Sequence, residues 1–452
     1  MTLILTGALA LVIVFVEAVS LRRRGQITFL TGVHTLILIG YCLPPFMLWL
    51  LPGTPWGDGI FGAIDPNPWG VRLYILDLAD HLRLPEGAFV TLSVILYGAY
   101  AALLAGYFLG GRLRVPALDG ARLPVASLLA IGAVLGVIAV AALTLYSLQF
   151  DGILRMIYLG PQVRAGDYPT RWGFLQVLAQ LALPAYLILI AVALRMSGWQ
   201  RQVLLLFAAC VWLIAASRTL HASGRLEMGS FLAIPVLAWI FLQRSKKVTI
   251  LALIGLGLCA VIVAGIPHNF ARNPLEIGLN TLVATFTRLS HHLTFLLGEF
   301  AFPHIAAAHT LTVTPDPIAF RHFIDVPLGL AYMLPNFAGV ETLPPMILSL
   351  HVEILPWIPV DLFSFGYYSL GTLGVLITFA TFGALLALFD GWLTESVGWM
   401  GQALRAAWLF YLPFRLFYAD PYAAMQSGFG LIAGTIMIAV LAAWAGWRRG
   451  KA

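Results

Sequence analysis

The sequence predicts an all-α polytopic membrane protein with about eleven membrane-spanning helices and a large helical loop outside the membrane. Its 452 residues are 60% hydrophobic and only 10% charged, whereas a soluble domain carries about a quarter charged residues. Apolar segments long enough to cross about 30 Å of hydrocarbon recur along the chain. We predict spans at 2–20, 27–50, 88–110, 124–149, 173–194, 203–216, 228–243, 248–266, 367–389, 399–418 and 425–446.

The charges divide the connecting segments between two faces of the membrane. One face holds 15 basic residues, including all three lysines, and four acids, or +11. The other holds 11 arginines and the remaining 16 acids, or −5, and the two sum to the net charge of +6. Basic residues favour the cytoplasmic face, so we predict an outward N-terminus and an inward C-terminus. The net charge reflects this orientation and does not indicate nucleic acid as a partner.

This topology predicts three regions. Residues 1–266 form N-terminal membrane helices with short outer loops. Residues 267–366 form a large outer loop, too apolar to be freely solvated, that packs on the membrane as interfacial or re-entrant helices. Residues 367–452 form C-terminal membrane helices.

The 11 arginines of the outer face are the main functional signal. Arginine is costly in or near a bilayer and is normally biased toward the cytoplasmic side. A guanidinium offers a permanent charge and a planar fork of donors that suits phosphate oxygens. The pattern therefore indicates a phosphate-bearing lipid substrate bound at the outer face. The arginines are at positions 72, 83, 155, 164, 171, 218, 225, 272, 288, 321 and 415.

The first candidate site is a short outer hairpin over 216–227. It contains Arg218, His221 and Arg225 among small residues that permit close backbone approach. The next helix starts here, so its N-terminal dipole favours an anion. The alternative is a solvated turn whose arginines extend toward water.

The second candidate site lies in the predicted helical run 275–299. Spacings of three and four place Arg288, His291 and His292 on one helix face. Such a face could bind pyrophosphate or assist proton transfer. A zinc site and a polar stripe on an interfacial helix are the alternatives.

The third candidate site is the loop 159–171, which leads into the span at 173–194. Arg164, Asp167 and Arg171 are held there among turn residues. A local ion pair between Arg164 and Asp167 is as consistent with this spacing as a catalytic role for Asp167.

Other outer residues complete the candidate set. Arg272, Arg321 and Arg415 are further arginines for substrate binding, and the large loop offers carboxylates that the sequence does not rank. These carboxylates are Asp325, Glu353 and Asp361.

Several chemistries lack their motif. The chain has no G-x-x-x-x-G-K-[ST], G-x-G-x-x-G or D-x-D sequence, so nucleotide hydrolysis and metal-dependent sugar-nucleotide transfer have no support. The three cysteines lie in apolar spans without metal spacing. Glu17 is the one clear acid within a span, which disfavours a proton-coupled transporter. We expect no metal and no cofactor.

Two segments resemble the oligosaccharide repeat-unit polymerases, the Wzy-like O-antigen and exopolysaccharide polymerases related to the O-antigen ligases. The hairpin is similar to the family's G-S-R-G motif, with Ala216 and Thr219 in place of the glycines, and Arg218 and Gly229 fit its R-x10-G spacing. The segment 365–375, FGYYSLGTLGV, is similar to the family's Y-x-N-F-G-x-x-G entry into a late span.

The resemblance implies a GT-C-like fold in a bacterial inner membrane, with the large loop and the active site facing the periplasm. It implies metal-independent, inverting glycosyl transfer between oligosaccharide repeat units carried on undecaprenyl pyrophosphate, with a chain-length regulator and a flippase as partners besides the lipid bilayer. Arg218, Arg225 and Arg288 would bind the diphosphate, while His291, His292 or Asp167 would assist proton transfer. The alternatives are a ligase that transfers glycan to lipid A-core and a membrane transporter.

Overall fold

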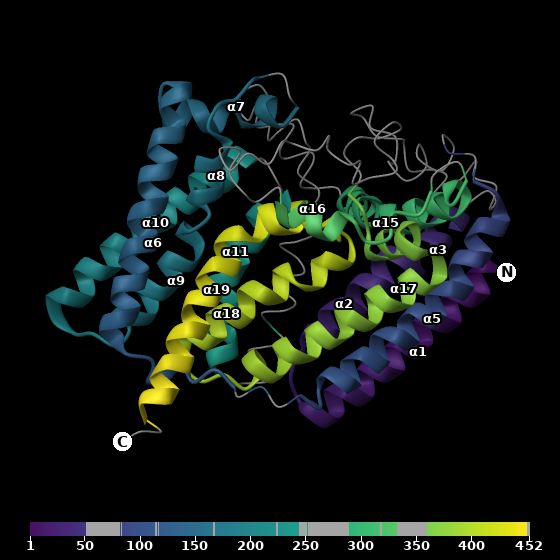
Figure 1. Ribbon diagram of the computed structural model, residues 1–452, viewed down its shortest axis with the longest axis horizontal. Helices are drawn as coiled ribbons and strands as arrows, with labels where there is room; N and C mark the ends of the chain where they lie inside the picture. Colours follow the sequence, from purple (N-terminus) through teal and green to yellow (C-terminus); the bar gives the residue numbers. More distant parts are fainter. Residues whose placement is uncertain are drawn as a thin grey trace. The chain divides into compact units, whose positions relative to one another are not determined.

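The computed structural model is helical, with no strand, in the part of the chain that it describes (Figure 1). This confirms the predicted all-α class. The structure describes residues 1–50, 82, 84–113, 115, 117–165, 168–222, 225–243, 251, 289–316, 319–331 and 359–449, with side chains at all of these except 47–50, 121, 161, 164–165, 225–230, 289–299, 331 and 446–449.

Eight helices among the described residues are long and apolar enough to cross a membrane, which supports a multi-pass membrane protein. Of the predicted spans, 248–266 lies outside the described residues except for residue 251, 228–243 contains only a shorter apolar helix, and 399–418 contains a helix of 14 residues. The eight helices are Thr2–Arg24, Phe29–Phe46, Glu86–Gly110, Val125–Phe150, Gly173–Ala193, Gly198–Ala222, Leu362–Thr394 and Pro421–Ala445.

Two predicted span boundaries are wrong. Helix α10 (Gly198–Ala222) continues for six residues beyond the predicted end at 216. Its polar side chains stay compatible with the helix because the Ser217 and Thr219 hydroxyls donate to carbonyls four residues earlier. Helix α17 (Leu362–Phe389) begins five residues before the predicted 367, because Asp361 caps its first turn.

The chain divides into two compact units, and each is described by itself. Neither unit is continuous in sequence, so the three predicted regions do not coincide with them. Unit 1 comprises Met1–Val115, Leu293–Gly391 and Tyr411–Met425, and unit 2 comprises Pro116–His292, Trp392–Phe410 and Gln426–Ala452.

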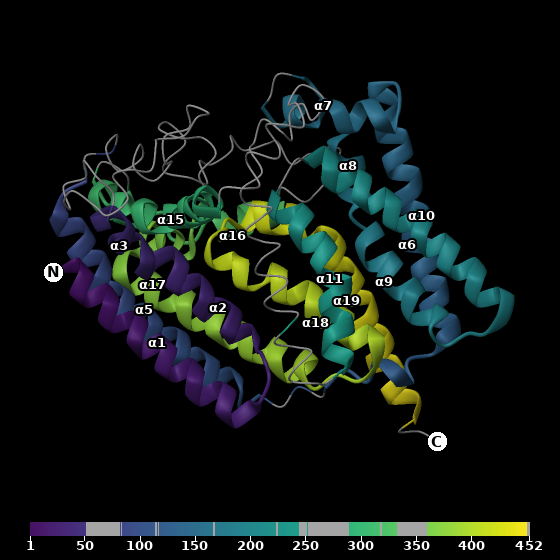
Figure 2. The same cartoon turned by 180° about the vertical axis from the view of Figure 1, so that it is seen from behind.

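Unit 1 contains four helices that lie side by side (Figures 1 and 2). Glycines allow two of them to approach closely: a β-carbon at Gly106 would lie 1.9 Å from the Ala380 carbonyl oxygen, and one at Gly383 would lie 2.1 Å from that of Leu103. Small residues commonly permit such packing between membrane helices. The four helices are α1 (Thr2–Arg24), α2 (Phe29–Ile37), α5 (Glu86–Gly110) and α17.

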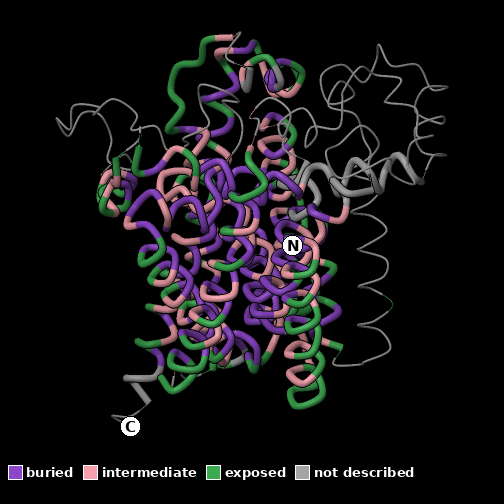
Figure 3. Tube along the Cα trace, turned by 90° about the vertical axis from the view of Figure 1, so that its right-hand side faces the viewer, coloured by how far each residue is buried: buried purple, intermediate pink, exposed green. Residues whose placement is uncertain are grey.

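Helix α1 packs along only one of its faces (Figure 3). The opposite face exposes large apolar side chains such as Leu11 and Phe15, as expected for a surface in contact with lipid. Its buried residues recur every three to four positions, and they are Thr2, Thr6, Leu9 and Ile13.

Helix α17 is broken inside the segment that resembles the polymerase motif. Leu370 (φ −149°) and Gly371 (φ 61°) leave the helical conformation, and a glycine tolerates the positive φ. The two carbonyl groups before the break are not left unpaired, because the Arg321 amide donates to Tyr368 and the His322 amide donates to Ser369. The segment around Arg321 is therefore tied to the break.

Unit 2 is built around helices packed on α10. Helix α7 (Ile153–Ala165) lies against α10 so closely that a β-carbon at Gly160 would fall 2.2 Å from the His221 carbonyl oxygen. Tyr146, Phe150 and Met156 belong to the buried cluster beside it. The other main helices are α6 (Val125–Ser147), α8 (Gly173–Ala179), α9 (Ala182–Ala193), α11 (Arg225–Gln243), α18 (Gly398–Tyr411) and α19 (Pro421–Arg449).

Candidate functional site

Unit 1 gathers acidic, basic and phenolic side chains around the first turns of α17. The charges of three aspartates and of Arg321 act on the Tyr368 hydroxyl, and Arg415 acts on one of these acids, Asp420. With all groups ionised, two arginines and three aspartates leave a net charge of −1. We call this group the aspartate cluster, and its members are Arg321, Asp325, Asp361, Tyr368, Arg415 and Asp420.

Asp361 is fully buried at the N-terminus of α17. Its carboxylate accepts hydrogen bonds from the Tyr41 hydroxyl (2.7 Å), the Phe363 amide (3.0 Å) and both the amide (3.1 Å) and the hydroxyl (2.5 Å) of Ser364. Burial raises the pKa of Asp361, and the bonds from Ser364 and Tyr41 oppose this effect. Because every contact is internal, Asp361 holds the start of α17 in place.

Arg321 and Asp325 form a buried pair at helix α16 (Asp325–Ala331). The guanidinium donates from Nε to Oδ2 (2.9 Å) and from NH2 to Oδ1 (2.5 Å). This is the bidentate geometry that arginine commonly adopts with a carboxylate. Burial raises the pKa of Asp325, and Arg321 opposes this effect. The protein itself therefore supplies an anion for Arg321.

Tyr368 lies between these groups. The Arg321 guanidinium is 5.8 Å from the centre of its ring. Its hydroxyl is buried and has no hydrogen-bond partner among the described residues. Because a buried unpaired hydroxyl is costly, a water molecule or a substrate group is the expected partner.

Asp420 differs from the other two aspartates because it is partly exposed, whereas Asp325 and Asp361 are fully buried. It precedes α19 and accepts a hydrogen bond from the Tyr422 amide (2.9 Å), the usual contact of an N-terminal cap. Burial raises the pKa of Asp420, Asp325 raises it further, and Arg415 lowers it. A carboxylate with a raised pKa and access to solvent is suited to act as a general base.

Arg415 belongs to the same cluster through its effect on Asp420. Its guanidinium lies over the Tyr411 ring, 4.4 Å from the centre, and it donates from Nε to the Tyr411 carbonyl (3.3 Å). Of the predicted substrate-binding arginines, Arg321 and Arg415 are thus brought to one cluster.

Unit 2 carries a second polar group, which we call the basic group. It consists of Asp151, Arg155, Arg171, Arg218 and His221, which among the described side chains comprise three arginines and one acid. Arg155 pairs with Asp151 at the surface. Arg171 is exposed, and its backbone amide donates to Gln149 (2.8 Å). Arg218 is partly buried near the end of α10.

His221 has a different position from the one predicted. It is buried in α10, and its two ring nitrogens contact the Met156 carbonyl (2.7 Å) and the Tyr146 hydroxyl (3.2 Å). Both nitrogens are therefore engaged within unit 2, and the ring fixes α7 and α6 against α10. His221 therefore lies within α10 rather than in the predicted short hairpin, and its predicted role in substrate binding stays a prediction.

The loop predicted over 159–171 is also partly helical. Residues up to Ala165 continue α7 through Pro161. Arg164 lies in this helix, Arg225 lies in α11, and His291 and His292 lie in α15 (Leu289–Val313). The side chains of these four residues are not described. Asp167, Arg272 and Arg288 lie outside the described residues. The roles predicted for these seven residues stay predictions.

Asp420 is the residue that the sequence reasoning missed. A usable signal exists, since Asp420 stands directly before Pro421, and an acid followed by proline is a common start of a helix. Asp361 and Ser364 similarly form a capping pattern before an apolar run. Neither signal reports that the aspartates at these two helix starts both act on Tyr368.

No group of three or more His, Cys, Asp or Glu side chains among the described residues lies close enough to hold a metal ion. Comparison with known protein families, with curated proteins and with solved structures found no match to the chain. The functional argument therefore depends on the residues themselves.

Proposed function

We propose that the protein is a membrane glycosyltransferase that polymerises oligosaccharide repeat units carried on undecaprenyl pyrophosphate. The observation that carries the proposal is Asp420, a partly exposed carboxylate with a raised pKa beside Arg415 and the unpaired Tyr368 hydroxyl. The outer arginines and the two motif-like segments support it. In this proposal the protein lies in a bacterial inner membrane and the aspartate cluster faces the periplasm.

Asp420 acts as the general base in the proposed reaction. It takes the proton from a sugar hydroxyl of the acceptor repeat unit, and the oxygen attacks the anomeric carbon of the donor glycan. The bond between that carbon and the pyrophosphate oxygen breaks, so the configuration inverts and undecaprenyl pyrophosphate leaves. The acidic balance of the aspartate cluster suits hydroxyl groups, which donate hydrogen bonds to carboxylates.

Arg218, Arg225 and Arg288 remain the predicted ligands for the pyrophosphate of a lipid substrate, because guanidinium donors stabilise charge on phosphate oxygens without a metal ion. These three arginines belong to unit 2, and the proposal for them is separate from that for the aspartate cluster of unit 1. Arg321 is less suited to this role because it is already paired with Asp325. This division replaces the earlier expectation that Arg321 binds substrate directly.

Analysis of lipid-linked glycans in a strain lacking the protein tests the proposal. Accumulation of undecaprenyl pyrophosphate carrying a single repeat unit supports a polymerase. Full-length polymer that stays on its lipid carrier would instead identify a ligase that transfers glycan to lipid A-core. A strain with unchanged glycans and unchanged lipid intermediates would contradict both.

A transporter is the second candidate, because α17 is interrupted within a candidate membrane span. Interrupted helices bind substrates or ions in many transporters through freed backbone groups. Here the carbonyls of Tyr368 and Ser369 are already paired with the backbone of the Arg321 segment, which weakens this candidate. Movement of lipid-linked repeat units across vesicles containing the purified protein, without elongation, would favour the transporter.

A further inference from the structure

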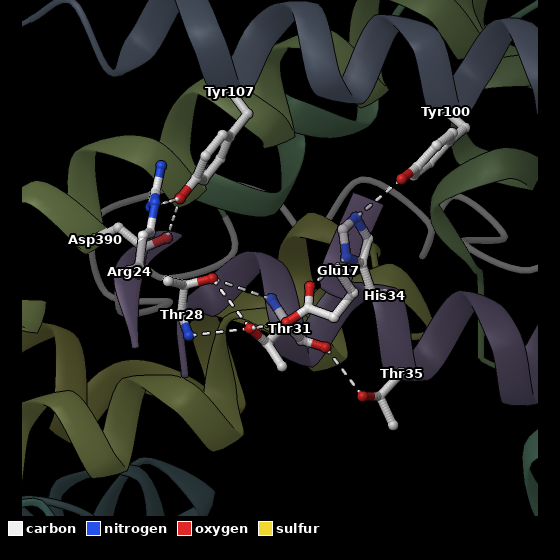
Figure 4. Close-up of polar contacts among 9 residues, drawn as sticks. All are labelled: Glu17, Arg24, Thr28, Thr31, His34, Thr35, Tyr100, Tyr107 and Asp390. Carbon is white, nitrogen blue, oxygen red and sulfur yellow. Dashed lines mark hydrogen bonds and ion pairs between the residues drawn. The ribbon is translucent and has the colours of Figure 1, made fainter. Parts of the chain in front are cut away.

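Unit 1 contains a further polar network, which lies toward one end of the group formed by α1, α2, α5 and α17 (Figure 4). We call this end of the helices the Arg24 end, because α1 ends there at Arg24. Glu17 on α1 contacts His34 on α2, with 2.6 Å between Oε2 and Nδ1. The His34 side chain is 2% exposed and that of Glu17 is 16% exposed. Both residues lie within candidate membrane spans, where a charged pair is costly and commonly functional.

Glu17 lies on the face of α1 that packs against the protein. It follows Thr6, Leu9 and Ile13 at the same spacing of three to four residues, so it does not point toward lipid. Seven residues separate it from Arg24, a rise of about 10 Å along a helix. The carboxylate is therefore held well inside the span but is connected to its basic end.

A continuous series of hydrogen bonds extends from that end. The Thr28 and Thr31 hydroxyls lie 3.2 Å apart, and Thr31 donates to Glu17 Oε1 (2.7 Å). Beyond the carboxylate, His34 Nε2 lies 3.2 Å from the Tyr100 hydroxyl. Hydroxyl, carboxyl and imidazole groups all both donate and accept protons in one or other protonation state. Thr28 is buried, but it follows the exposed residues Arg24 and Gly25 directly after the end of α1, so the series begins next to the basic end of the span.

Further charged and titratable groups lie on the helices packed around the pair. Asp390, at the end of α17, accepts from the Phe29 amide (2.9 Å) and from the Tyr107 hydroxyl (2.7 Å), and Arg24 donates to the same hydroxyl (2.6 Å). These contacts form a separate network at the Arg24 end. The other charged or titratable side chains described on the packed elements, besides Glu17 and His34, are Arg22, Arg23, Arg24, Tyr41, Cys42, Glu86, Tyr97, Tyr100, Tyr107, Tyr367, Tyr368 and Asp390.

We propose that Glu17 and His34 form a proton-binding site inside the membrane part of unit 1, filled from the Arg24 end through Thr28 and Thr31. When the pair is ionised, both ring nitrogens of His34 carry a proton and the Glu17 carboxylate carries none. Binding of one more proton neutralises Glu17 and leaves a net positive charge between α1, α2 and α5. The site shares no residue with the aspartate cluster, so the proposal does not rest on glycosyl transfer.

Infrared difference spectroscopy of the full-length protein in lipid nanodiscs tests this site directly. The carboxyl C=O band that appears on acidification should contain one component that Glu17→Gln removes. The matched control is Glu86→Gln, the same change at an exposed glutamate of unit 1, which should leave that component in place. A spectrum in which Glu17→Gln and the wild type are identical would overturn the proposal.

Two further variants keep the test decisive even where Glu17→Gln does not fold. His34→Gln removes the cation that favours the charged form of Glu17. The proton affinity of the Glu17 carboxylate should therefore rise about tenfold or more, which moves the midpoint of its carboxyl band to higher pH. Tyr100→Phe should move it in the same direction by less, because the hydroxyl bonded to His34 Nε2 is lost. Midpoints unchanged in both variants would show that the carboxyl does not belong to the pair and would overturn the proposal.

Discussion

The aspartate cluster of unit 1 and the basic group of unit 2 use arginine in opposite ways. In the aspartate cluster two arginines are balanced by three aspartates, and Arg321 is held in a two-pronged buried pair. In the basic group the described side chains comprise three arginines and the acid Asp151, which pairs with Arg155. The difference teaches that an arginine is a weaker sign of phosphate binding where a buried carboxylate already pairs with it, as at Arg321. The acidic balance of the aspartate cluster therefore suits hydroxyl groups, and the pyrophosphate role of Arg218 stays a prediction.

Asp420→Asn should have the largest effect on turnover. Loss of a general base costs about 10²–10⁴-fold in rate, whereas the matched change Asp151→Asn at the exposed acid of the basic group should leave the rate close to wild type. Because the pKa of Asp420 is raised, wild-type activity should fall with decreasing pH at a higher pH than for an ordinary aspartate. A variant with normal turnover of purified lipid-linked substrate would remove Asp420 from the mechanism.

Arg321→Ala should act mainly on stability. It leaves the fully buried Asp325 without its partner, and breaking a buried ion pair in this way costs about 3–5 kcal/mol. Thermal unfolding in detergent measures the effect, and the exposed pair broken by Arg155→Ala provides the control. If Arg321→Ala stays as stable as the wild type yet no longer binds lipid-linked substrate, the two arginine groups do not differ as we describe.

Arg218→Ala should lower turnover without unfolding the protein. Loss of one charged donor to a developing anion costs about 2.7–4 kcal/mol, or on the order of 10²–10³ in rate. Arg218→Lys should restore little, since lysine lacks the planar fork of donors. The same result is expected at Arg225 and Arg288, and normal polymerisation by all three alanine variants at equal protein levels would exclude the pyrophosphate clamp.

Gly366→Ala should have the smallest of these effects, and it tests the packing that holds the aspartate cluster. A β-carbon there would lie 2.6 Å from Thr378 Oγ1 and 2.7 Å from the Val375 α-carbon, so the helix turn before the break must shift. Overpacking of this kind costs about 1–3 kcal/mol. Gly87→Ala, at a position with no neighbour within 4 Å, is the control. Equal melting temperatures for both variants would show that the break in α17 is not tightly packed.

The helical class and the membrane location could be read from the sequence because both follow from long apolar runs. Span boundaries were harder to predict where a helix contains polar residues. Ser217 and Thr219 lie within α10 because their hydroxyl groups donate to its backbone, and the residue types alone do not show that these bonds form. Arg321 and Arg415 were predicted to bind substrate, and the carboxylates that act on them, Asp325 and Asp420, are only four and five residues away in sequence. Asp420 approaches Asp325, almost a hundred residues earlier, only through tertiary structure, so local sequence patterns could not select it.

Elongation by the purified protein tests the central claim most directly. We predict that the protein, supplied only with undecaprenyl pyrophosphate carrying one repeat unit, forms a ladder of longer lipid-linked glycans, and that the ladder persists in EDTA. Asp420→Asn should leave the substrate at one repeat unit. Failure of the wild-type protein to lengthen the glycan would contradict the account, and a loss on chelation that a divalent ion restores would contradict its metal-independent chemistry.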